Sequence, residues 1–214
     1  MRSETLPERR TASTAVCAIG LLALAAVLPL HGQTQEEPSP SPVTYGTVAA
    51  ETELRVMGTS TLHDWTVTTE QIKGHITLDP AAGPARRLQA VSVMIPAGSL
   101  KSDHKKMNKK MYETLETDKH PNVTYTLSSA EPAKAPDEGA TQLATTGMLT
   151  LHGTKKTITM PLRVESLSES KLKLSGEYTL DMTDYGMKPP KAMLGAIRVG
   201  PEVTVAFDWV VEAE

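Results

Sequence analysis

Apolar and polar residues alternate along most of the chain after residue 50. Near its end, Val203, Val205 and Phe207 alternate with polar residues such as Glu202 and Thr204. Because successive side chains of a β-strand point to opposite faces, this period of two predicts strands with one apolar and one polar face. About eight segments carry the pattern: 52–59, 65–78, 88–97, 123–128, 143–151, 158–164, 172–180 and 203–209.

Strands of this kind form antiparallel sheets with one buried and one solvated face. About eight of them can close into a barrel, which leaves no exposed sheet edge and can enclose one small ligand. A β-sandwich is the alternative, but it favours short connections, whereas two connections here are long: the segment after residue 100 and the loop 184–201. We therefore predict an all-β fold, an eight-stranded antiparallel up-and-down barrel with one inserted helix. We also expect a bend at Gly74, where the phase of the second strand changes.

The inserted helix is predicted between Ser102, a plausible N-cap, and Pro121, which ends helical structure before it. Its apolar residues fall at helical spacing on one face: Met107, Met111, Tyr112 and Leu115. This face either closes a barrel as a lid or packs as ordinary core. Its basic residues either form a solvated surface or contact anionic lipid headgroups: Lys105, Lys106, Lys109 and Lys110.

The front of the chain is predicted to be a targeting segment. Three arginines precede the nearly all-apolar run Ala15–Leu30, so residues 1–32 are interpreted as a secretory signal peptide or, alternatively, as an uncleaved N-terminal membrane anchor. Residues 33–43 form a Pro/Ser-rich linker that cannot bury a core. Residues 44–214 are expected to form one domain, exported to a bacterial periplasm or secreted.

Composition excludes several classes of function. Lys and Arg total 22 against 25 Asp and Glu, and aromatic residues are only 4%, so no nucleic-acid partner is predicted. Cys17 is the only cysteine and precedes the domain, which therefore has neither a disulfide nor a thiol nucleophile. No G-x-S-x-G sequence and no glycine-rich phosphate loop are present. We therefore predict a protein that is not an enzyme and needs no cofactor.

The histidines could carry chemistry, each against a simpler explanation. His63 with Asp64 could be an acid/base pair, part of a site for a ligand headgroup, or a turn residue bonded to the backbone. Five histidines are candidate ligands of a metal site: His63, His75, His104, His120 and His152. No two of them have the i, i+4 helical spacing or an HExxH pattern, so scattered surface histidines and no metal site are predicted.

Four stretches together carry a resemblance to a known family. They are GTSTLHDW (58–65), the segment from LKS to NVTY (100–125), GMLTLHGTKKTITMPL (147–162) and DMTDYGMKPPKAMLGAIRVGPEVTVAF (181–207). In their order and spacing they resemble the YceI-like family of bacterial exported proteins. The chain has Met111-Tyr112 and Val123-Thr-Tyr125 where Phe is commoner in the family, which places it in a divergent branch.

The resemblance implies an extended lipocalin-like barrel that binds polyisoprenoids or other long-chain amphiphiles. It also implies that His63 lies near the barrel mouth. We therefore predict an exported binding protein that sequesters or carries a polyisoprenoid, isoprenoid quinone or fatty-acid-like amphiphile, with transient membrane contact. The predicted ligand-binding residues are Val56, His63, Trp65, Val93, Ile95, Met107, Met111, Tyr112, Leu115, Tyr125, Leu149, Met160, Leu174, Tyr178 and Phe207.

The alternative is a periplasmic protein-interaction module whose barrel is filled by its own side chains. Small residues such as Gly147 and Gly176 favour a cavity, since they leave space on the inward face. Large residues could instead fill it: Trp65, Trp209, Phe207 and Tyr178. Side-chain volume on the inward face discriminates between these two predictions, and solvent extraction with mass spectrometry of the purified protein decides between them.

Overall fold

A computed structural model describes residues 41–82, 88–133 and 140–214, so the predicted signal segment and most of the predicted linker lie outside the described residues. The strands are β1 (Val43–Thr47), β2 (Glu53–Ser60), β3 (Trp65–Thr69), β4 (Lys73–Leu78), β5 (Leu88–Pro96), β6 (Asn122–Pro132), β7 (Ala140–Leu151), β8 (Thr154–Ser166), β9 (Lys171–Asp181), β10 (Lys191–Ala192) and β11 (Ile197–Ala213). The helices are α1 (Lys105–Leu115) and the short 3-10 turns η1 (Ala49–Glu51), η2 (Ala97–Ser99), η3 (Met182–Tyr185) and η4 (Met193–Gly195). None of the described helices is both long and apolar enough to span a bilayer.

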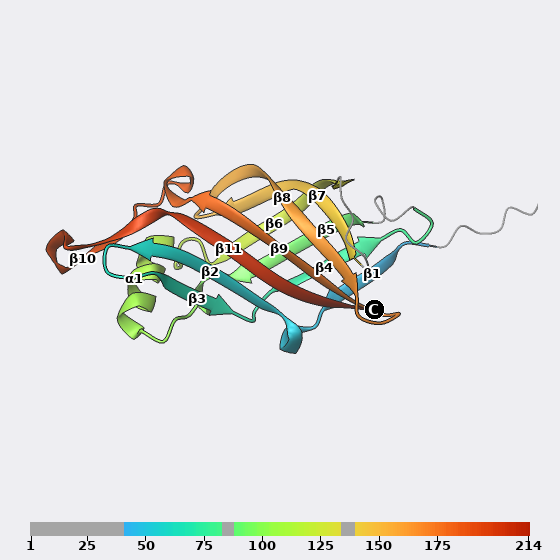
Figure 1. The fold of residues 1–214 in the computed structure, drawn as a ribbon, viewed down its shortest axis with the longest axis horizontal. Coiled ribbons are helices and arrows are strands. Elements are labelled where there is room, and N and C mark those ends of the chain that lie inside the picture. Colours follow the sequence, from blue (N-terminus) through green and yellow to red (C-terminus); the bar gives the residue numbers. More distant parts are fainter. Residues whose placement is uncertain (1–40, 83–87, 134–139) are drawn as a thin grey trace, which may run out of the picture. The chain divides into compact units, whose positions relative to one another are not determined.

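The strands close into an antiparallel barrel (Figure 1). The sheet runs β1-β4-β5-β6-β7-β8-β9-β11, and β11 pairs back with β1, for example Val211 with Thr47. β2 follows β1 along the long strand β11, with which both pair, and β3 pairs with β2 as β4 pairs with β1. The four short strands therefore form one long, interrupted hairpin. The prediction of an eight-stranded up-and-down barrel is confirmed, and the β-sandwich alternative is wrong.

The first hairpin is interrupted in both of its strands. Residues 48–52 separate β1 from β2, and residues 70–72 separate β3 from β4. β4 pairs with β5, whereas β3 pairs with β2, and on its other side Thr68 exchanges two backbone hydrogen bonds of 2.8 and 2.9 Å with Lys101. The residues after β5 therefore lead out of the barrel wall and into α1.

The predicted bend at Gly74 is wrong. Gly74 pairs regularly with Val93, and the break in the strand lies just before it, at residues 70–72. A Cβ at position 74 would lie only 2.3 Å from the Ser92 carbonyl oxygen and 3.1 Å from the Trp209 ring. The glycine is therefore explained by close approach of the neighbouring backbone and ring, a second reason for glycine in strands.

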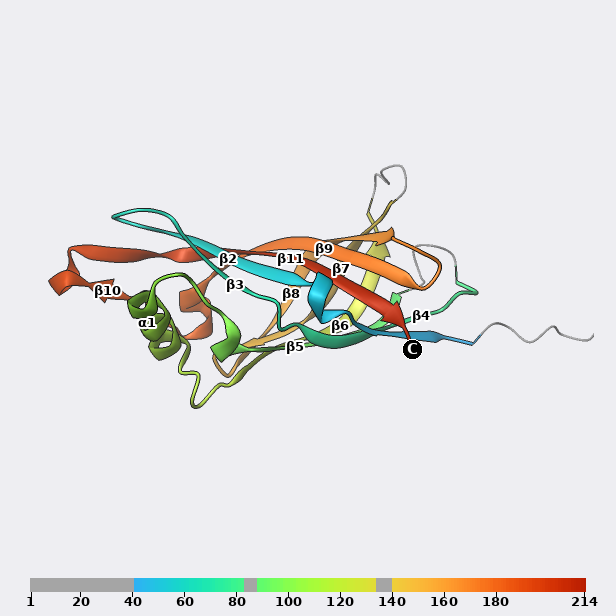
Figure 2. The ribbon, with the colours of Figure 1, turned by 90° about the horizontal axis from the view of Figure 1, so that it is seen from below.

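The predicted loop 184–201 is partly a hairpin. β10 pairs with the start of β11 through Lys191 and Arg198, and β11 begins at Ile197, before the end of the predicted loop. The prolines and glycines of this segment predict a loop, so the short pairing of β10 with β11 was not predicted from the sequence. Figures 1 and 2 show that this hairpin, α1 and the β2–β3 turn lie at the same end of the barrel.

The core lies inside the barrel. Ile76, Leu174 and Val211 are at most 1% exposed, and they belong to one apolar cluster. On β8 the alternation is clear, because Ile158 is buried and Thr157 beside it is exposed. The sequence pattern therefore identified the inward and outward faces of this strand correctly.

Candidate functional site

The barrel encloses a cavity of about 480 Å³. This volume lies within the range of about 300–1,000 Å³ found for small-molecule sites. The cavity is lined almost entirely by apolar side chains, which come from the strands and from one face of α1. Such a space can hold an apolar ligand by excluding water from it.

The structure brings nearly all of the predicted site residues together around this cavity. Those that line it are Val56, His63, Trp65, Val93, Ile95, Met107, Met111, Leu115, Tyr125, Leu149, Met160, Leu174, Tyr178 and Phe207. Their common position around the cavity is thus established, and binding of a ligand by these residues stays a prediction.

Tyr112 lies on another side of α1. Met107, Met111 and Leu115 repeat every four residues and face the cavity. At about 100° per residue, Tyr112 is turned by about 100° from Met111, away from that stripe. Its hydroxyl donates a hydrogen bond of 2.7 Å to the Leu100 carbonyl oxygen, so it ties the helix to the preceding segment. The placement of Tyr112 on the same helical face was wrong.

The helix also begins later than expected. Its first residue is Lys105 and its N-cap is His104, which makes no side-chain capping bond. Ser102 is instead held by Asn108, because the Ser102 hydroxyl and backbone N–H both donate to the Asn108 side-chain oxygen at 2.8 Å. The polar Ser102 is therefore explained by a clamp between the incoming segment and α1.

Several lining residues were missed by sequence reasoning. Leu62, Met182, Met187 and Ile197 lie in segments that carry no clear alternation, and all four line the cavity. Leu100 also lines it, just before the predicted helix. The only sequence signal for these residues was that they are apolar and lie in otherwise polar turns. Periodicity does not predict the topology that brings these turns to one end of the barrel.

The two glycines expected to enlarge the cavity do not do so. A Cβ at Gly147 would lie 2.5 Å from the Tyr125 hydroxyl, and one at Gly176 would lie 2.9 Å from the Phe207 ring. Both glycines are therefore covered by an aromatic ring of a neighbouring strand, as occurs in sheets where a ring shields a glycine. The space in the barrel is left by the arrangement of the aliphatic side chains.

The buried polar groups of the lining include the hydroxyls of Tyr125 and Thr145. Thr145 donates a hydrogen bond of 3.0 Å to the Met160 carbonyl oxygen. Burial raises the pKa of the Tyr125 hydroxyl, although a contact with Thr145 lowers it by less. Tyr125 is therefore neutral at physiological pH, and the inner part of the cavity carries no charge.

Polar and charged lining residues gather where the lining is exposed, and we call this region the mouth. It contains exposed side chains from α1, the β2–β3 turn and β10: Leu62, His63, Lys106, Lys110 and Lys191. In the turn, Ser60 donates to the His63 carbonyl oxygen at 2.8 Å, and the His63 Nδ1 lies 2.6 Å from the Asp64 backbone carbonyl oxygen. The His63 ring therefore contacts the Asp64 backbone, as expected for the turn interpretation rather than for an acid/base pair.

Solved structures share this fold. A polyisoprenoid-binding domain from Saccharophagus degradans, implicated in plant cell wall breakdown, matches with a TM-score of 0.63 and 18% identity, over 80% of this chain and 99% of that one. BcnA from Burkholderia cenocepacia matches with a TM-score of 0.64 and 17% identity, over 77% and 98%. A Campylobacter jejuni YceI protein matches with a TM-score of 0.54 and 16% identity, over 68% and 82%.

Comparison of sequences gives the family. No curated protein matches the chain significantly. The YceI-like domain family, in contrast, matches residues 45–211, which include α1 and all or most of each strand of the barrel wall. This match covers far more than half of the chain and agrees with the closed barrel and its inserted helix. The chain therefore belongs to the YceI-like domain family.

Proposed function

We propose that this protein binds one long-chain apolar ligand inside its barrel and carries or sequesters it. The ligand class is a polyisoprenoid, an isoprenoid quinone or a fatty-acid-like amphiphile. The observation that carries the proposal is the apolar cavity of about 480 Å³ inside the barrel. The structurally similar domain from Saccharophagus degradans is described as polyisoprenoid-binding, which supports the same ligand class here.

Burial of the ligand tail supplies the binding free energy. Each methylene removed from water contributes roughly 0.8 kcal/mol, so a tail that buries about ten of them gains about 8 kcal/mol, equivalent to a Kd near 1 μM. The net binding free energy is smaller, because the tail loses conformational freedom when it is ordered in the cavity. It is smaller again when the free lipid lies in a membrane and not in water. A carrier needs this moderate affinity, because it must also release its ligand.

The mouth supplies the contacts for a polar or anionic headgroup. Lys106 and Lys110 line the cavity and lie on one flank of the apolar stripe of α1, whereas Lys105 and Lys109 lie in a second depression beside Tyr112. A ligand with its tail inside the barrel therefore places its head near Lys106 and Lys110. His63, in the β2–β3 turn, also lines the cavity and offers a further hydrogen-bonding group.

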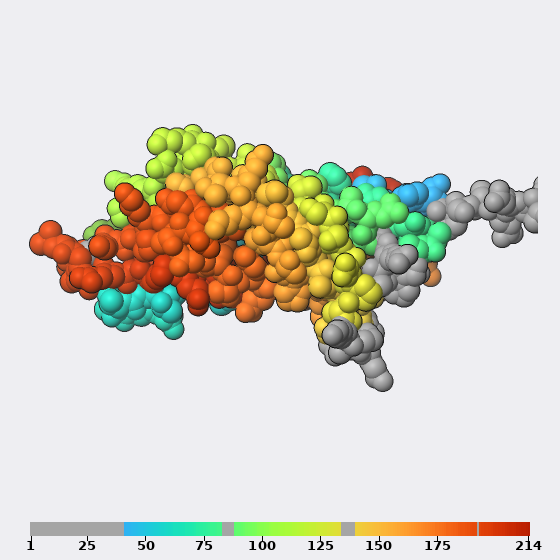
Figure 3. Space-filling view, turned by 90° about the horizontal axis from the view of Figure 1, so that it is seen from above, coloured from blue at the N-terminus to red at the C-terminus, as the bar shows by residue number. Residues whose placement is uncertain are grey.

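Transient contact with a membrane is proposed for the same end of the barrel. Exposed apolar side chains lie in its turns: Leu62 at 66% exposure, Met193 at 74%, and Leu194, which is fully exposed. Basic residues flank the β10–β11 turn, with Lys191 before it and Arg198 after it. Apolar tips with basic flanks favour insertion into an anionic bilayer surface. Figure 3 shows the hairpin projecting beside the β2–β3 turn.

Export to the periplasm or secretion is part of the proposal. It rests on the basic start of the chain, the apolar run Ala15–Leu30 and the Pro/Ser-rich segment 33–43. A role as a binding protein rather than an enzyme is supported by the cavity, whose buried polar side chains are the hydroxyls of Tyr125 and Thr145 and the indole of Trp209.

Extraction of the purified protein tests the proposal. Organic extraction followed by mass spectrometry should recover about one equivalent of a long-chain lipid per chain. Val93→Phe adds volume on the cavity side and should lower this amount, whereas Met148→Phe, on an exposed position of β7, should not. Absence of any lipid, together with failure of the delipidated protein to take up lipid from vesicles, would favour the self-filled interaction module.

A further inference from the structure

Two histidines and a carboxylate meet beside the C-terminal end of α1, outside the cavity. Glu116, His120 and His152 each offer one ligand atom, and these atoms all lie within 4.8 Å of one another. The rings of His120 and His152 are in edge contact, with centroids 5.0 Å apart. The His152 Nε2 lies 4.0 Å from a Glu116 carboxylate oxygen. The scattered arrangement expected for the histidines is therefore wrong for this pair.

The backbone is shaped to bring these three side chains together. Glu116 caps α1 with φ 47°, and His152 has φ 51° in the β7–β8 turn. Such left-handed conformations are costly for residues with a Cβ and occur often at functional sites. A Cβ on the next residue, Gly153, would lie 2.6 Å from the His120 ring, so glycine there makes room for that ring. His120 is also fixed by its backbone N–H, which donates to the Glu116 carbonyl oxygen at 2.8 Å.

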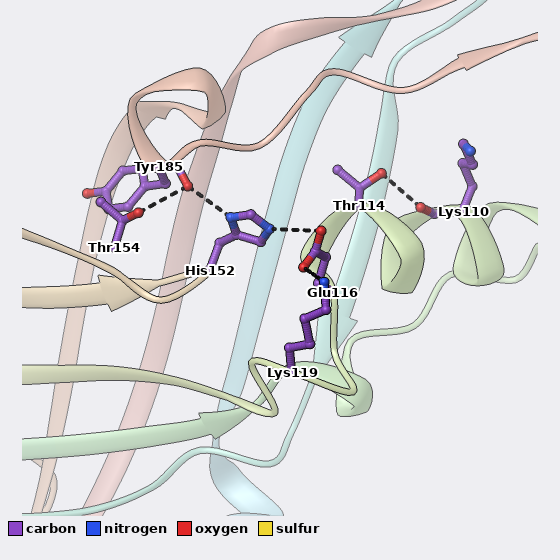
Figure 4. A network of polar contacts seen from close by, with 7 residues as sticks. All are labelled: Lys110, Thr114, Glu116, Lys119, His152, Thr154 and Tyr185. Atoms are coloured by element: carbon purple, nitrogen blue, oxygen red, sulfur yellow. Dashed lines mark hydrogen bonds and ion pairs between the residues drawn. The ribbon is translucent and has the colours of Figure 1, made fainter.

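Figure 4 shows His152 and Glu116, whose hydrogen bonds to other groups leave one nitrogen of the ring and one oxygen of the carboxylate facing each other. The His152 Nδ1 lies 3.0 Å from the Tyr185 carbonyl oxygen. A carbonyl oxygen only accepts, so Nδ1 carries the proton, and in a neutral ring Nε2 keeps its lone pair toward Glu116. One oxygen of Glu116 accepts from Lys119 at 2.8 Å, while the other faces His152. Histidines that bind metals have this arrangement, with the second ring nitrogen bonded to a carbonyl or carboxylate.

We propose that Glu116, His120 and His152 bind one divalent transition-metal ion of the zinc class. Imidazole nitrogens with one carboxylate oxygen suit Zn²⁺, Cu²⁺, Ni²⁺ or Co²⁺ and do not suit Ca²⁺ or Mg²⁺. At metal–ligand distances of about 2.1 Å, a tetrahedral ion needs its ligand atoms about 3.4 Å apart. The side chains are only partly buried, so rotations that move each ligand atom by about an ångström suffice. The fourth position is left to water or a small exogenous ligand.

An ion at this site would connect three elements at one end of the barrel. Glu116 follows Leu115 of α1, His152 lies in the β7–β8 turn, and the bonded carbonyl belongs to Tyr185 of η3. Leu115 lines the cavity. If the cavity holds a lipid, as proposed above, the ion would hold the end of α1 against the barrel and slow release of that lipid. This consequence rests on the proposed function, whereas metal binding itself does not.

Calorimetric titration of the untagged full chain with ZnCl₂ tests the site. The expected result is one equivalent bound, a raised Tm at saturating Zn²⁺, and intense visible absorption of the Co²⁺ form, as for a tetrahedral ion. Glu116→Gln, His120→Asn and His152→Ala should each weaken binding at least tenfold. His75→Ala removes an exposed histidine on β4 and should leave the affinity unchanged. Circular dichroism checks that each variant folds. His152 has a positive φ, which alanine adopts less easily, so His152→Ala can fail to fold; Glu116→Gln and His120→Asn then test the site by themselves.

Three results distinguish failure of the metal site, of its effect on lipid release and of the proposed function. Unchanged Zn²⁺ affinity in the folded Glu116→Gln and His120→Asn variants, or no binding by the parent protein, would overturn the metal site. Binding with the expected variant pattern but without slower lipid release in Zn²⁺ would uphold the site and overturn the consequence for α1. Binding in protein that neither contains nor takes up lipid would uphold the site while contradicting the proposed function.

Discussion

The hydroxyl of Tyr112 donates a hydrogen bond of 2.7 Å to the carbonyl oxygen of Leu100, and this bond ties α1 to the segment that leads out of β5. Leu100 is buried and lines the cavity, whereas Tyr112 faces away from it. The helix is thus held by a polar contact on one flank and by apolar contacts of Met107 and Met111 on another. These two kinds of contact can be removed separately.

Tyr112→Phe removes the polar contact alone. The Leu100 carbonyl oxygen then loses a partner in a buried place, so the free energy of unfolding should fall by about 1 kcal/mol. Equilibrium unfolding in urea measures this loss. The amount of lipid bound should not change, because Tyr112 does not line the cavity. A loss of lipid without a loss of stability would show that Tyr112 acts as a ligand-binding residue after all.

Leu174→Asp tests which face of the strands is buried. Leu174 is 1% exposed inside the barrel, so an aspartate there would be an unpaired charge or a neutral acid without partners. The free energy of unfolding should fall by several kcal/mol, enough to prevent folding of a marginally stable domain. Thr157→Asp introduces the same group at an exposed position of β8 and should change stability by less than about 1 kcal/mol. Circular dichroism and thermal melting of both variants provide the comparison.

Alkaline pH should destabilise the protein through Tyr185. Burial, with smaller contributions from Tyr178 and Asp184, raises the pKa of this residue from 10.0 to about 12. The unfolded state therefore releases the phenolic proton first. The protonated Tyr185 contributes fully to the free energy of unfolding below pH 10. This contribution, about 2–3 kcal/mol, is lost as the pH rises from 10 to 12. Denaturant unfolding at pH 9 and pH 11.5 measures the loss.

Tyr185→Phe is the control for this pH dependence. The variant lacks the ionisable hydroxyl, so it should lose less stability between the two pH values than the parent protein does. Ionisation of lysines and other tyrosines affects both proteins alike and cancels in the comparison. An identical pH dependence would show that Tyr185 ionises at its ordinary pKa in the folded state.

Contact with membranes should depend on the β10–β11 turn. Met193 and Leu194 both have positive φ, at 50° and 55°, and aspartate tolerates this conformation better than most residues with a Cβ. Met193→Asp combined with Leu194→Asp should therefore fold, yet co-sedimentation with anionic phosphatidylglycerol vesicles should fall at least tenfold, because two inserting side chains are replaced by repelled charges. Thr146→Asp combined with Thr159→Asp, on the outer surface of the barrel wall, is the matched control. Equal loss in both double variants would indicate only general charge repulsion.

Local pattern was sufficient to predict the barrel wall. The alternation of Ile158 with Thr157 or of Val205 with Thr204 reports which side of a strand is apolar, and in a closed barrel that side is the interior. Most predicted site residues therefore line the cavity, because inward-facing apolar residues of a barrel with space inside become its lining. The resemblance to the family also implied a lipocalin-like barrel, whereas the inserted helix was predicted from the spacing of its apolar residues and from Pro121.

Features that depend on contacts distant in sequence could not be predicted in this way. Tyr112 was misplaced because its partner, Leu100, lies outside the helix, and helical spacing alone treats neighbouring apolar residues alike. His120 and His152 share no sequence spacing, since they meet only where the end of α1 reaches the β7–β8 turn. Gly147 and Gly176 indicated empty space, although rings from adjacent strands cover them.

Met107→Ala combined with Met111→Ala tests whether α1 is the lid of the cavity. Both side chains line the cavity and are only partly buried, so their truncation should lower stability modestly, by about 1–2 kcal/mol in total. Each also loses its contact with a bound tail. If each methionine contributes about 1 kcal/mol to ligand burial, the affinity should fall by about thirtyfold in the double variant. Lipid retained per chain after extensive dialysis against empty vesicles, with Tm measured in parallel, gives both quantities.

Lys105→Ala combined with Lys109→Ala is the matched control for this test, because both lysines lie on the helix but face the second depression rather than the cavity. This variant should retain lipid as the parent protein does. Methionine is flexible and fits apolar partners of different shape, so Met107→Leu combined with Met111→Leu should restore most of the retention for one lipid while narrowing the range of lipids accepted. If the double alanine variant loses stability but keeps its lipid, α1 is ordinary core packing, and release of the ligand must use another part of the mouth.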